Sequence, residues 1–411
     1  MTTSERERTI NLGAGPCTLP TSVLETAARG LLDYEGTGMG VVELSHRSKE
    51  FQELNEMAQT DIRRLLRVPE GFEILFMQGG GLTQFSCVVM NLVNQFRLAN
   101  QTNKEDQVVV DYLVTGSWSL KASKEAARLG CRVNVVADGR SCCPDNSNSF
   151  RGIPRPSEWR LSSCDAKEIP AFLYYCDNET VDGVEFGSPG IPVENLPAHY
   201  LERVPLVVDM SSNILTRQIP EGLWKYIGIV FAGAQKNLGP AGLTLVLVRK
   251  NLIPHNLDLA VPLGGLRVPD LLCYKHSADH RSLYNTPPIF SIYVASLVLR
   301  HLIQQGGIQT IQEINLQKSL AVYHAIDSSQ GFYFNSILPD ARSRINIVFN
   351  CRAGPSTDDL FIQEADKFYG IKQIKGHRSV GGIRVSLYNA VTLDQVNTLC
   401  TFMLEFAARN R

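Results

Sequence analysis

Residues 227–248 read IGIVFAGAQKNLGPAGLTLVLV, and this stretch decides the fold class. Two apolar runs, 227–231 and 243–248, flank a segment of small residues around one lysine, Lys236. Neither run alternates apolar and polar residues, which is typical of strands covered on both faces. The glycine-rich, low-charge setting would desolvate Lys236 and favour the neutral amine, which can form a Schiff base. A solvated surface lysine is the alternative for Lys236 taken alone.

Similar runs alternate with helical patterns along the rest of the chain, which predicts an α/β fold with a mostly parallel central sheet flanked by helices. Apolar spacing predicts helices around residues 23–34, 51–65, 119–129 and 289–303, and a closing helix from residue 393. We expect a large domain over residues 1–305 and a smaller C-terminal α/β domain over residues 306–411, with residues 1–15 packing on the smaller domain. Strands are expected at residues 72–77, 108–114, 132–137, 172–175, 205–209, 345–349 and 383–387, besides the two above.

Composition and charge exclude several classes of protein. The chain has 411 residues, 40 Lys plus Arg against 41 Asp plus Glu, and a net charge of −1. This balance gives no electrostatic footprint for nucleic acid or an anionic membrane. No apolar stretch reaches the roughly 20 residues that span a bilayer, and the first nine residues lack the apolar core of a secretory signal. We therefore expect a cytoplasmic protein, ten free cysteines and no metal site.

Two further motifs stand at strand ends. Residues 78–85 read QGGGLTQF directly after the strand at 72–77. Three glycines let backbone N–H groups approach an anion, and the following helix adds partial positive charge, so the motif predicts a phosphate cradle. Asp209 ends an apolar strand, where ligands bind in open α/β sheets. The alternatives are a plain strand-to-helix turn for the glycines and a helix N-cap for Asp209.

Two cationic pairs, His46-Arg47 and His377-Arg378, lie far apart in the sequence. Arginine binds carboxylate or phosphate through a planar fork, although surface salt bridges are the alternative for each pair. A lysine after one strand, an aspartate at the end of the previous strand and an upstream glycine cradle are together the set that pyridoxal phosphate requires. The cationic pairs then favour a substrate with two anionic groups.

With these motifs, the chain resembles the phosphoserine aminotransferase family of fold-type-I pyridoxal-phosphate enzymes. The resemblance covers nearly the whole chain, and many motifs occur in order, which makes it specific. The motifs are residues 11–16 (NLGAGP), 45–51 (SHRSKEF), 78–85 (QGGGLTQF), 115–119 (TGSWS), 178–183 (NETVDG), 209–212 (DMSS), 233–242 (GAQKNLGPAG), 284–288 (YNTPP) and 376–390 (GHRSVGGIRVSLYNA).

The resemblance implies a role for each site residue. Lys236 would bind the cofactor aldehyde and shuttle the proton, and Asp209 would pair with the pyridine nitrogen. His46 and Arg47 would meet the distal anion of the substrate, and Arg378 its α-carboxylate. Trp118 would stack on the face of the cofactor ring, with Thr180 beside the ring. Gly81, Leu82 and Gln235 would hold the cofactor phosphate, and Asn285 and Thr286 would reach the cofactor phosphate of the neighbouring subunit of a homodimer. His377 would assist Arg378 in binding the substrate. Lys372 and the loop 139–160 receive no role.

The expected reaction is a ping-pong transfer of an amino group from glutamate to 3-phosphohydroxypyruvate in serine biosynthesis, giving phosphoserine and 2-oxoglutarate. Two alternatives stay open. Another fold-type-I enzyme, such as a serine–glyoxylate-type transaminase or a cysteine desulfurase, would use the same cofactor. A desulfurase needs a reactive cysteine, and Cys351 is the nearest candidate. A non-catalytic protein that kept the fold is the alternative from a different class.

Overall fold

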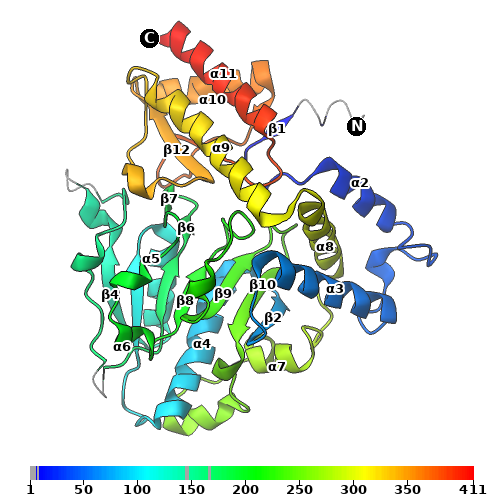
Figure 1. Cartoon of the computed structure of the whole chain (residues 1–411), viewed down its shortest axis with the longest axis vertical. Helices are drawn as coiled ribbons and strands as arrows, with labels where there is room; N and C mark the ends of the chain where they lie inside the picture. The colour runs from blue at the N-terminus through cyan, green and yellow to red at the C-terminus, as the bar shows by residue number, and fades with distance from the viewer. Residues whose placement is uncertain (1–5, 7–8, 144–147, 165–167) are drawn as a thin grey trace.

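The computed structural model describes residues 6, 9–143, 148–164 and 168–411. Figure 1 shows a large lower body around a sheet and a smaller upper body formed mainly by the chain from α9 (Gly307–Asp327) to the C-terminus. The expected division into two domains stays a prediction. The boundary at residue 306 stays a prediction, although α8 (Ile289–Gln304) and α9 (Gly307–Asp327) are separate helices on either side of it.

The lower body is built on a seven-stranded sheet with the order β2-β10-β9-β8-β5-β3-β4. Strand β10 is antiparallel to both neighbours, and the other pairings are parallel. All strands except β10 therefore end at one edge of the sheet. The bounds, which lie within two residues of the predicted ones, are β2 Phe72–Met77, β3 Val109–Val114, β4 Arg132–Asp138, β5 Leu173–Cys176, β8 Leu206–Asp209, β9 Ile227–Gly233 and β10 Thr244–Arg249.

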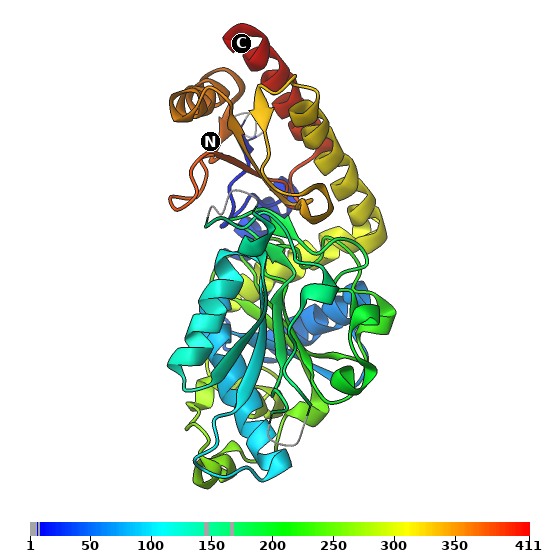
Figure 2. The same ribbon diagram turned by 90° about the vertical axis from the view of Figure 1, so that its left-hand side faces the viewer.

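Helices cover both faces of this sheet, which the edge-on view in Figure 2 makes plain. One face packs with α3 and α8, and the other with α4, α5 and α7. Buried side chains on both faces explain why the strands read as continuous apolar runs. The helices of the lower body are α2 Thr21–Gly30, α3 Lys49–Leu66, α4 Gly80–Asn100, α5 Ser117–Arg128, α6 Ala198–Leu201, α7 Tyr274–Asp279 and α8 Ile289–Gln304.

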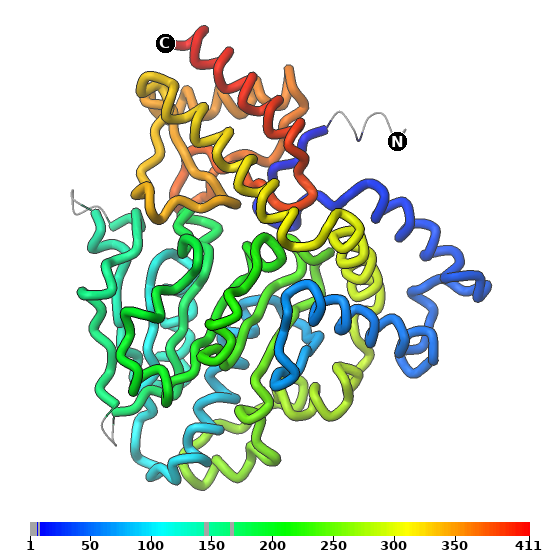
Figure 3. Tube along the Cα trace, in the orientation of Figure 1, coloured from blue at the N-terminus to red at the C-terminus, as the bar shows by residue number. Residues whose placement is uncertain are grey.

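The upper body has its own apolar core around a three-stranded sheet with the order β11-β12-β14. The N-terminal strand β1 (Ile10–Asn11) pairs in parallel with β13 (Ile371–Lys372), and Figure 3 traces the N-terminal segment alongside this body before α2. We expected residues 1–15 to pack on the smaller domain, and of these, residues 1–5, 7 and 8 lie outside the described residues. The remaining elements are α9 Gly307–Asp327, β11 Tyr333–Phe334, β12 Asn346–Cys351, α10 Pro355–Tyr369, β14 Ile383–Ser386 and α11 Leu393–Asn410.

The described parts of the loop 139–160 are anchored to the lower body by two buried side chains. Phe150 and Trp159 are buried in the apolar clusters on the two faces of the sheet. Short 3₁₀ helices at Gly139–Cys142 and Pro156–Glu158 supply local structure on either side of residues 144–147, which lie outside the described ones. Within the described part of the chain, no helix is both long and apolar enough to span a bilayer.

Candidate active site

The carboxyl edge of the large sheet gathers residues that lie far apart in the sequence. Strand β2 leads into Gly79, β8 ends at Asp209, and β9 leads into Lys236. Because these strands run in the same direction, their ends meet at one edge. A cavity of about 400 Å³ opens there, and the residues that line it include Gly81, Leu82, Trp118, Thr180, Asp209, Gln235, Lys236, His377 and Arg384.

Lys236 is buried at the floor of this cavity. Its Nζ atom donates a hydrogen bond to Oγ1 of Thr180 at 2.6 Å and lies 5.9 Å from the ring centroid of Trp118. Burial lowers the pKa of Lys236, while the nearby negative charge of Asp209 opposes that shift. Lowering the pKa enlarges the fraction of neutral amine, which is the nucleophilic form. The burial of Lys236 agrees with the desolvation that the sequence predicted, and its role in binding a cofactor stays a prediction.

Asp209 is buried and held by two donors. The backbone N–H of Ser211 donates to Oδ1 at 2.9 Å, and the hydroxyl of Tyr174 donates to Oδ2 at 3.3 Å. Burial raises the pKa of Asp209, whereas the hydrogen bonds from Ser211 and the charge of Lys236 lower it. A buried carboxylate beside a cavity is costly without a cationic or protonated partner. The site thus offers a carboxylate suited to a protonated ring nitrogen.

Two helices, α4 and α5, begin at this edge, and among the described residues carboxylate side chains bind the first amides of α5. Glu179 accepts hydrogen bonds from the backbone N–H groups of Trp118 and Ser119, both at 2.9 Å, and Asp182 accepts one from Ser117 at 2.7 Å. These carboxylates occupy the N-terminus of α5. At the start of α4, the N–H of Gly80 donates to Oγ1 of Thr244 at 2.9 Å, and the next two residues, Gly81 and Leu82, line the cavity.

The glycine turn before α4 gives those amides their access. Gly79 has φ +93° and Gly80 has φ +68°, a left-handed backbone that favours glycine. A Cβ atom on Gly79 would lie 2.1 Å from Oγ1 of Thr83. The amides of Gly81 and Leu82, which have no acceptor within the helix, are thus available to an anion.

Arg384 was missed as a site residue by the sequence analysis. It lies on β14, lines the cavity, and donates from Nη1 to the backbone oxygen of Thr180 at 3.3 Å. Burial lowers its pKa. His377 lines the same cavity, whereas Arg378 is exposed and is not among the described lining residues. The available signal was the charged residue inside a short strand whose neighbours Ile383 and Val385 are apolar.

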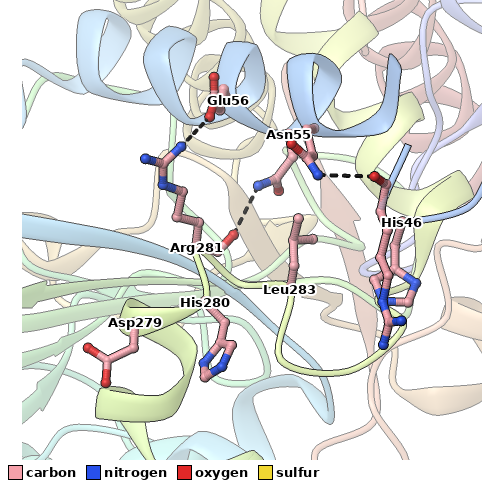
Figure 4. Close-up of a pocket in the computed structure, with 9 residues that line it drawn as sticks. His46, Asn55, Glu56, Asp279, His280, Arg281 and Leu283 are labelled. Atoms are coloured by element: carbon pink, nitrogen blue, oxygen red, sulfur yellow. Dashed lines mark hydrogen bonds and ion pairs between the residues drawn. The ribbon is translucent and has the colours of Figure 1, made fainter. Parts of the chain in front are cut away.

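The other predicted residues form a separate group. His46 and Arg47 line a second pocket of about 280 Å³ (Figure 4), whose far end holds Arg281 in an ion pair with Glu56. Oγ1 of Thr286 lies 3.3 Å from Nδ1 of His46, so this group also includes the segment that carries Asn285 and Thr286. The structure of one chain therefore brings these four residues together but does not place them in the lining of the Lys236 cavity that it describes.

Cys351, the candidate thiol of the desulfurase alternative, is buried in the apolar core of the upper body. Burial raises its pKa above the usual range of a thiol. A thiol of this kind is inert rather than nucleophilic. The geometry therefore gives no support to a desulfurase that uses Cys351.

Comparisons with known proteins agree with this architecture. Residues 9–399 match the family Aminotransferase class-V. The chain is 41% identical over 402 residues to the phosphoserine aminotransferase of Albidiferax ferrireducens, covering 98% of this chain and 99% of the relative. It is 42% identical over 400 residues to that of Laribacter hongkongensis, covering 97% and 99%. The chain therefore belongs to the class-V aminotransferases and, within them, to the phosphoserine aminotransferase family.

Solved structures lead to the same family. Phosphoserine aminotransferase from Bacillus circulans subsp. alkalophilus superposes with a TM-score of 0.85 at 37% identity, covering 98% of this chain and 100% of that one. The enzyme from Trichomonas vaginalis with bound PLP gives a TM-score of 0.80 at 35% identity, covering 96% and 99%. Ureidoglycine–glyoxylate aminotransferase from Bacillus subtilis, at 14% identity and a TM-score of 0.73, shares the fold. The chain is an aminotransferase.

Proposed function

We propose that this aminotransferase passes an amino group from L-glutamate to 3-phosphohydroxypyruvate, a step of serine biosynthesis, with pyridoxal phosphate as its cofactor. The observation that carries the proposal is one cavity holding a buried lysine, a buried aspartate and the free amides of a helix N-terminus. The family relationship supports the reaction, and the motifs found between residues 11 and 390 support the same family.

The described residues fit the cofactor. The amides of Gly81 and Leu82 at the start of α4, with the side chain of Gln235, would hold its phosphate. Asp209 would keep its ring nitrogen protonated, and Trp118 would cover one ring face. The Nε1 atom of Trp118 is buried without a hydrogen-bond partner among the described residues, so a bound molecule would supply one. When bound, the cofactor supplies the electron sink that stabilises negative charge at the substrate Cα.

The chain itself supplies the proton transfer. Lys236 would bind the cofactor aldehyde at rest and, once displaced by the substrate amine, carry a proton between the substrate Cα and the cofactor. Thr180 would keep the released amine within reach through the 2.6 Å hydrogen bond from Nζ to Oγ1. The lowered pKa of Lys236 favours the neutral form that can accept the proton.

Arg384 is the stronger candidate for the substrate α-carboxylate. Its guanidinium lies in the cavity lining beside Thr180, whereas Arg378 points from an exposed position in the turn before β14. A guanidinium binds a carboxylate through two parallel hydrogen bonds. We therefore propose Arg384 for the α-carboxylate, with His377 and Arg378 at the entrance.

The distal anion would be bound by residues of a second copy of the chain. His46, Arg47, Asn285 and Thr286 cluster together outside the described lining of their own cavity, which supports a homodimer in which they complete the partner's site. Leu82 at the cavity is 52% exposed, as expected of a surface that a second copy covers. We propose that this homodimer works in the cytoplasm.

An absorption titration of the purified protein tests the substrate. Glutamate should bleach the visible band of the bound cofactor, and 3-phosphohydroxypyruvate should restore it. Restoration by glyoxylate alone would favour the serine–glyoxylate type of transaminase. A protein saturated with pyridoxal phosphate that shows no such band would favour the non-catalytic alternative.

A further inference from the structure

Lys318 is a buried lysine that the transamination chemistry described above does not use. It lies in α9 with an exposed fraction of 0%, and its Nζ atom donates hydrogen bonds to the backbone oxygens of Leu387, Tyr388 and Val391 at 3.1, 2.9 and 3.0 Å. No carboxylate of the described residues forms an ion pair with it. All of its donors therefore serve one turn, residues 387–391.

A buried lysine is costly unless its donors are satisfied. Here burial lowers the pKa of Lys318 to about 7. The ammonium form can serve all three carbonyl oxygens, and the neutral amine still has two donors. Without the lysine, these buried oxygens would lose their shared donor, and an unpaired buried acceptor destabilises the conformation that buries it.

The other side of the turn contacts the loop that carries Lys236. The backbone N–H of Asn389 donates to Oδ1 of Asn237 at 3.0 Å, and the side chain of Asn389 donates to the backbone oxygen of Leu215 at 3.0 Å. Asn237 directly follows Lys236 in the chain. The turn thus connects α9 of the upper body to the position of the amine.

The same turn also fixes a second wall of the cavity. It continues from β14, which carries Arg384. The hydroxyl of Tyr388 donates to the backbone oxygen of Ala14 at 2.8 Å, and Ala14 lines the cavity. A shift of the turn would therefore displace Arg384 relative to Lys236.

We propose that Lys318 is a positioning residue of the aminotransferase site, which fixes the turn 387–391 and thereby the placement of Arg384 relative to Lys236. The inference rests on the proposed roles of those two residues. Lys318 touches neither the cavity nor any group that reacts, and it acts only through the turn.

Three variants separate this role from general stability. Lys318→Met keeps the length of the side chain and removes every donor. Asn237→Ala removes the acceptor on the far side of the turn. Leu320→Ala is the matched control, because Leu320 lies on the same helix with an exposed fraction of 58%. If Lys318→Met yields no folded protein, Lys318→Gln, which keeps two donors, is judged by the same criteria.

Hydrogen–deuterium exchange and the glutamate half-reaction are measured on each variant. Lys318→Met should speed exchange in peptides covering residues 234–239 and 387–391. It should also lower the second-order rate constant of the reaction with glutamate about 10- to 100-fold, as expected when Arg384 moves by about 1 Å relative to Lys236. In the Lys318→Met and Asn237→Ala double variant, the fold-decrease in this rate constant should be smaller than the product of the fold-decreases in the two single variants. Leu320→Ala should match the wild type.

The proposal is overturned if Lys318→Met leaves exchange at residues 234–239 unchanged and reacts with glutamate within twofold of the wild-type rate. It is also overturned if the fold-decrease in the double variant equals the product of the two single fold-decreases. The glutamate half-reaction does not depend on the second substrate. If glutamate bleaches the visible band of the wild-type protein but 3-phosphohydroxypyruvate does not restore it, the proposed substrate is disproved. The test of Lys318 still holds in that case, because it uses only the reaction with glutamate.

Discussion

The Nζ atom of Lys236 and the Oγ1 atom of Thr180 lie 2.6 Å apart, and the amine donates to the hydroxyl. Thr180 lies in the turn between β6 (Asn178–Glu179) and β7 (Val184–Glu185). Its backbone oxygen accepts a hydrogen bond from Arg384 on the upper body. One threonine therefore contacts both the proposed catalytic amine and the proposed carboxylate-binding arginine.

Removal of the Thr180 hydroxyl should slow transamination by loosening the released amine. Thr180→Val keeps the shape of the side chain, and the loss of one hydrogen bond, about 1 kcal/mol, predicts a rate of the glutamate half-reaction lower by about 5- to 10-fold. Thr180→Ser, which retains the hydroxyl, should stay within about twofold of the wild type. Stopped-flow absorbance measures both. Equal rates in the valine and serine variants would contradict the role of the hydrogen bond.

Replacement of Asp209 should impair the chemistry far more than the fold. Asp209→Asn is nearly isosteric and removes the charge that would hold the ring nitrogen protonated, so we expect the glutamate half-reaction to slow by about 100-fold or more. Asp340→Asn, at an exposed position, is the control and should leave the rate unchanged. A near-normal rate for Asp209→Asn would remove Asp209 from the proposed site.

The two arginines of the upper body should behave differently. Arg384→Ala should lower kcat/KM for glutamate by about 100-fold or more, because it removes a partly buried partner of the substrate carboxylate. Arg378→Ala should have the smaller effect, since its side chain is exposed. Steady-state kinetics with both substrates compares them. A larger loss for Arg378→Ala would restore the role that the sequence assigned to Arg378.

Lys318 should make the free energy of unfolding depend on pH. Its pKa is about 7 in the folded protein and near 10.4 in an unfolded chain, so the folded state binds fewer protons between these values. The free energy of unfolding should therefore rise with pH in this window, by at most about 1.4 kcal/mol per pH unit. Urea unfolding at pH 6.5 and pH 9 should show wild type gaining stability relative to Lys318→Met. A difference that does not change with pH would contradict the shift.

The sequence predicted the parts of the site that lie next to strand ends. Lys236, Asp209 and the glycines before α4 each follow an apolar run, and parallel strands bring their ends to one edge. The strand pattern predicts that these residues share one edge of the sheet, but not which atoms they contact. Thr180, the hydrogen-bond partner of Lys236, lies in a turn between two strands of two residues each, which are too short to give a periodic pattern.

Residues whose partners come from distant elements were harder to predict. Arg384 and Lys318 read as ordinary charged positions in a strand and a helix. Only the folded structure shows that Arg384 contacts Thr180 of the lower body and that Lys318 binds the turn 387–391 within the upper body. Local patterns also misplaced the ends of one helix. The apolar spacing predicts a helix around residues 23–34, but α2 begins at Thr21 after Pro20 and ends at Gly30.

The central claim is that Lys236 is the amine that binds the cofactor. Borohydride reduction of the protein loaded with pyridoxal phosphate fixes the cofactor covalently to the lysine that holds its aldehyde, and peptide mass spectrometry then locates it. We predict the modification on the peptide that contains Lys236, and its loss in Lys236→Ala. Modification of a different lysine in the wild type, or none at all, would contradict the account.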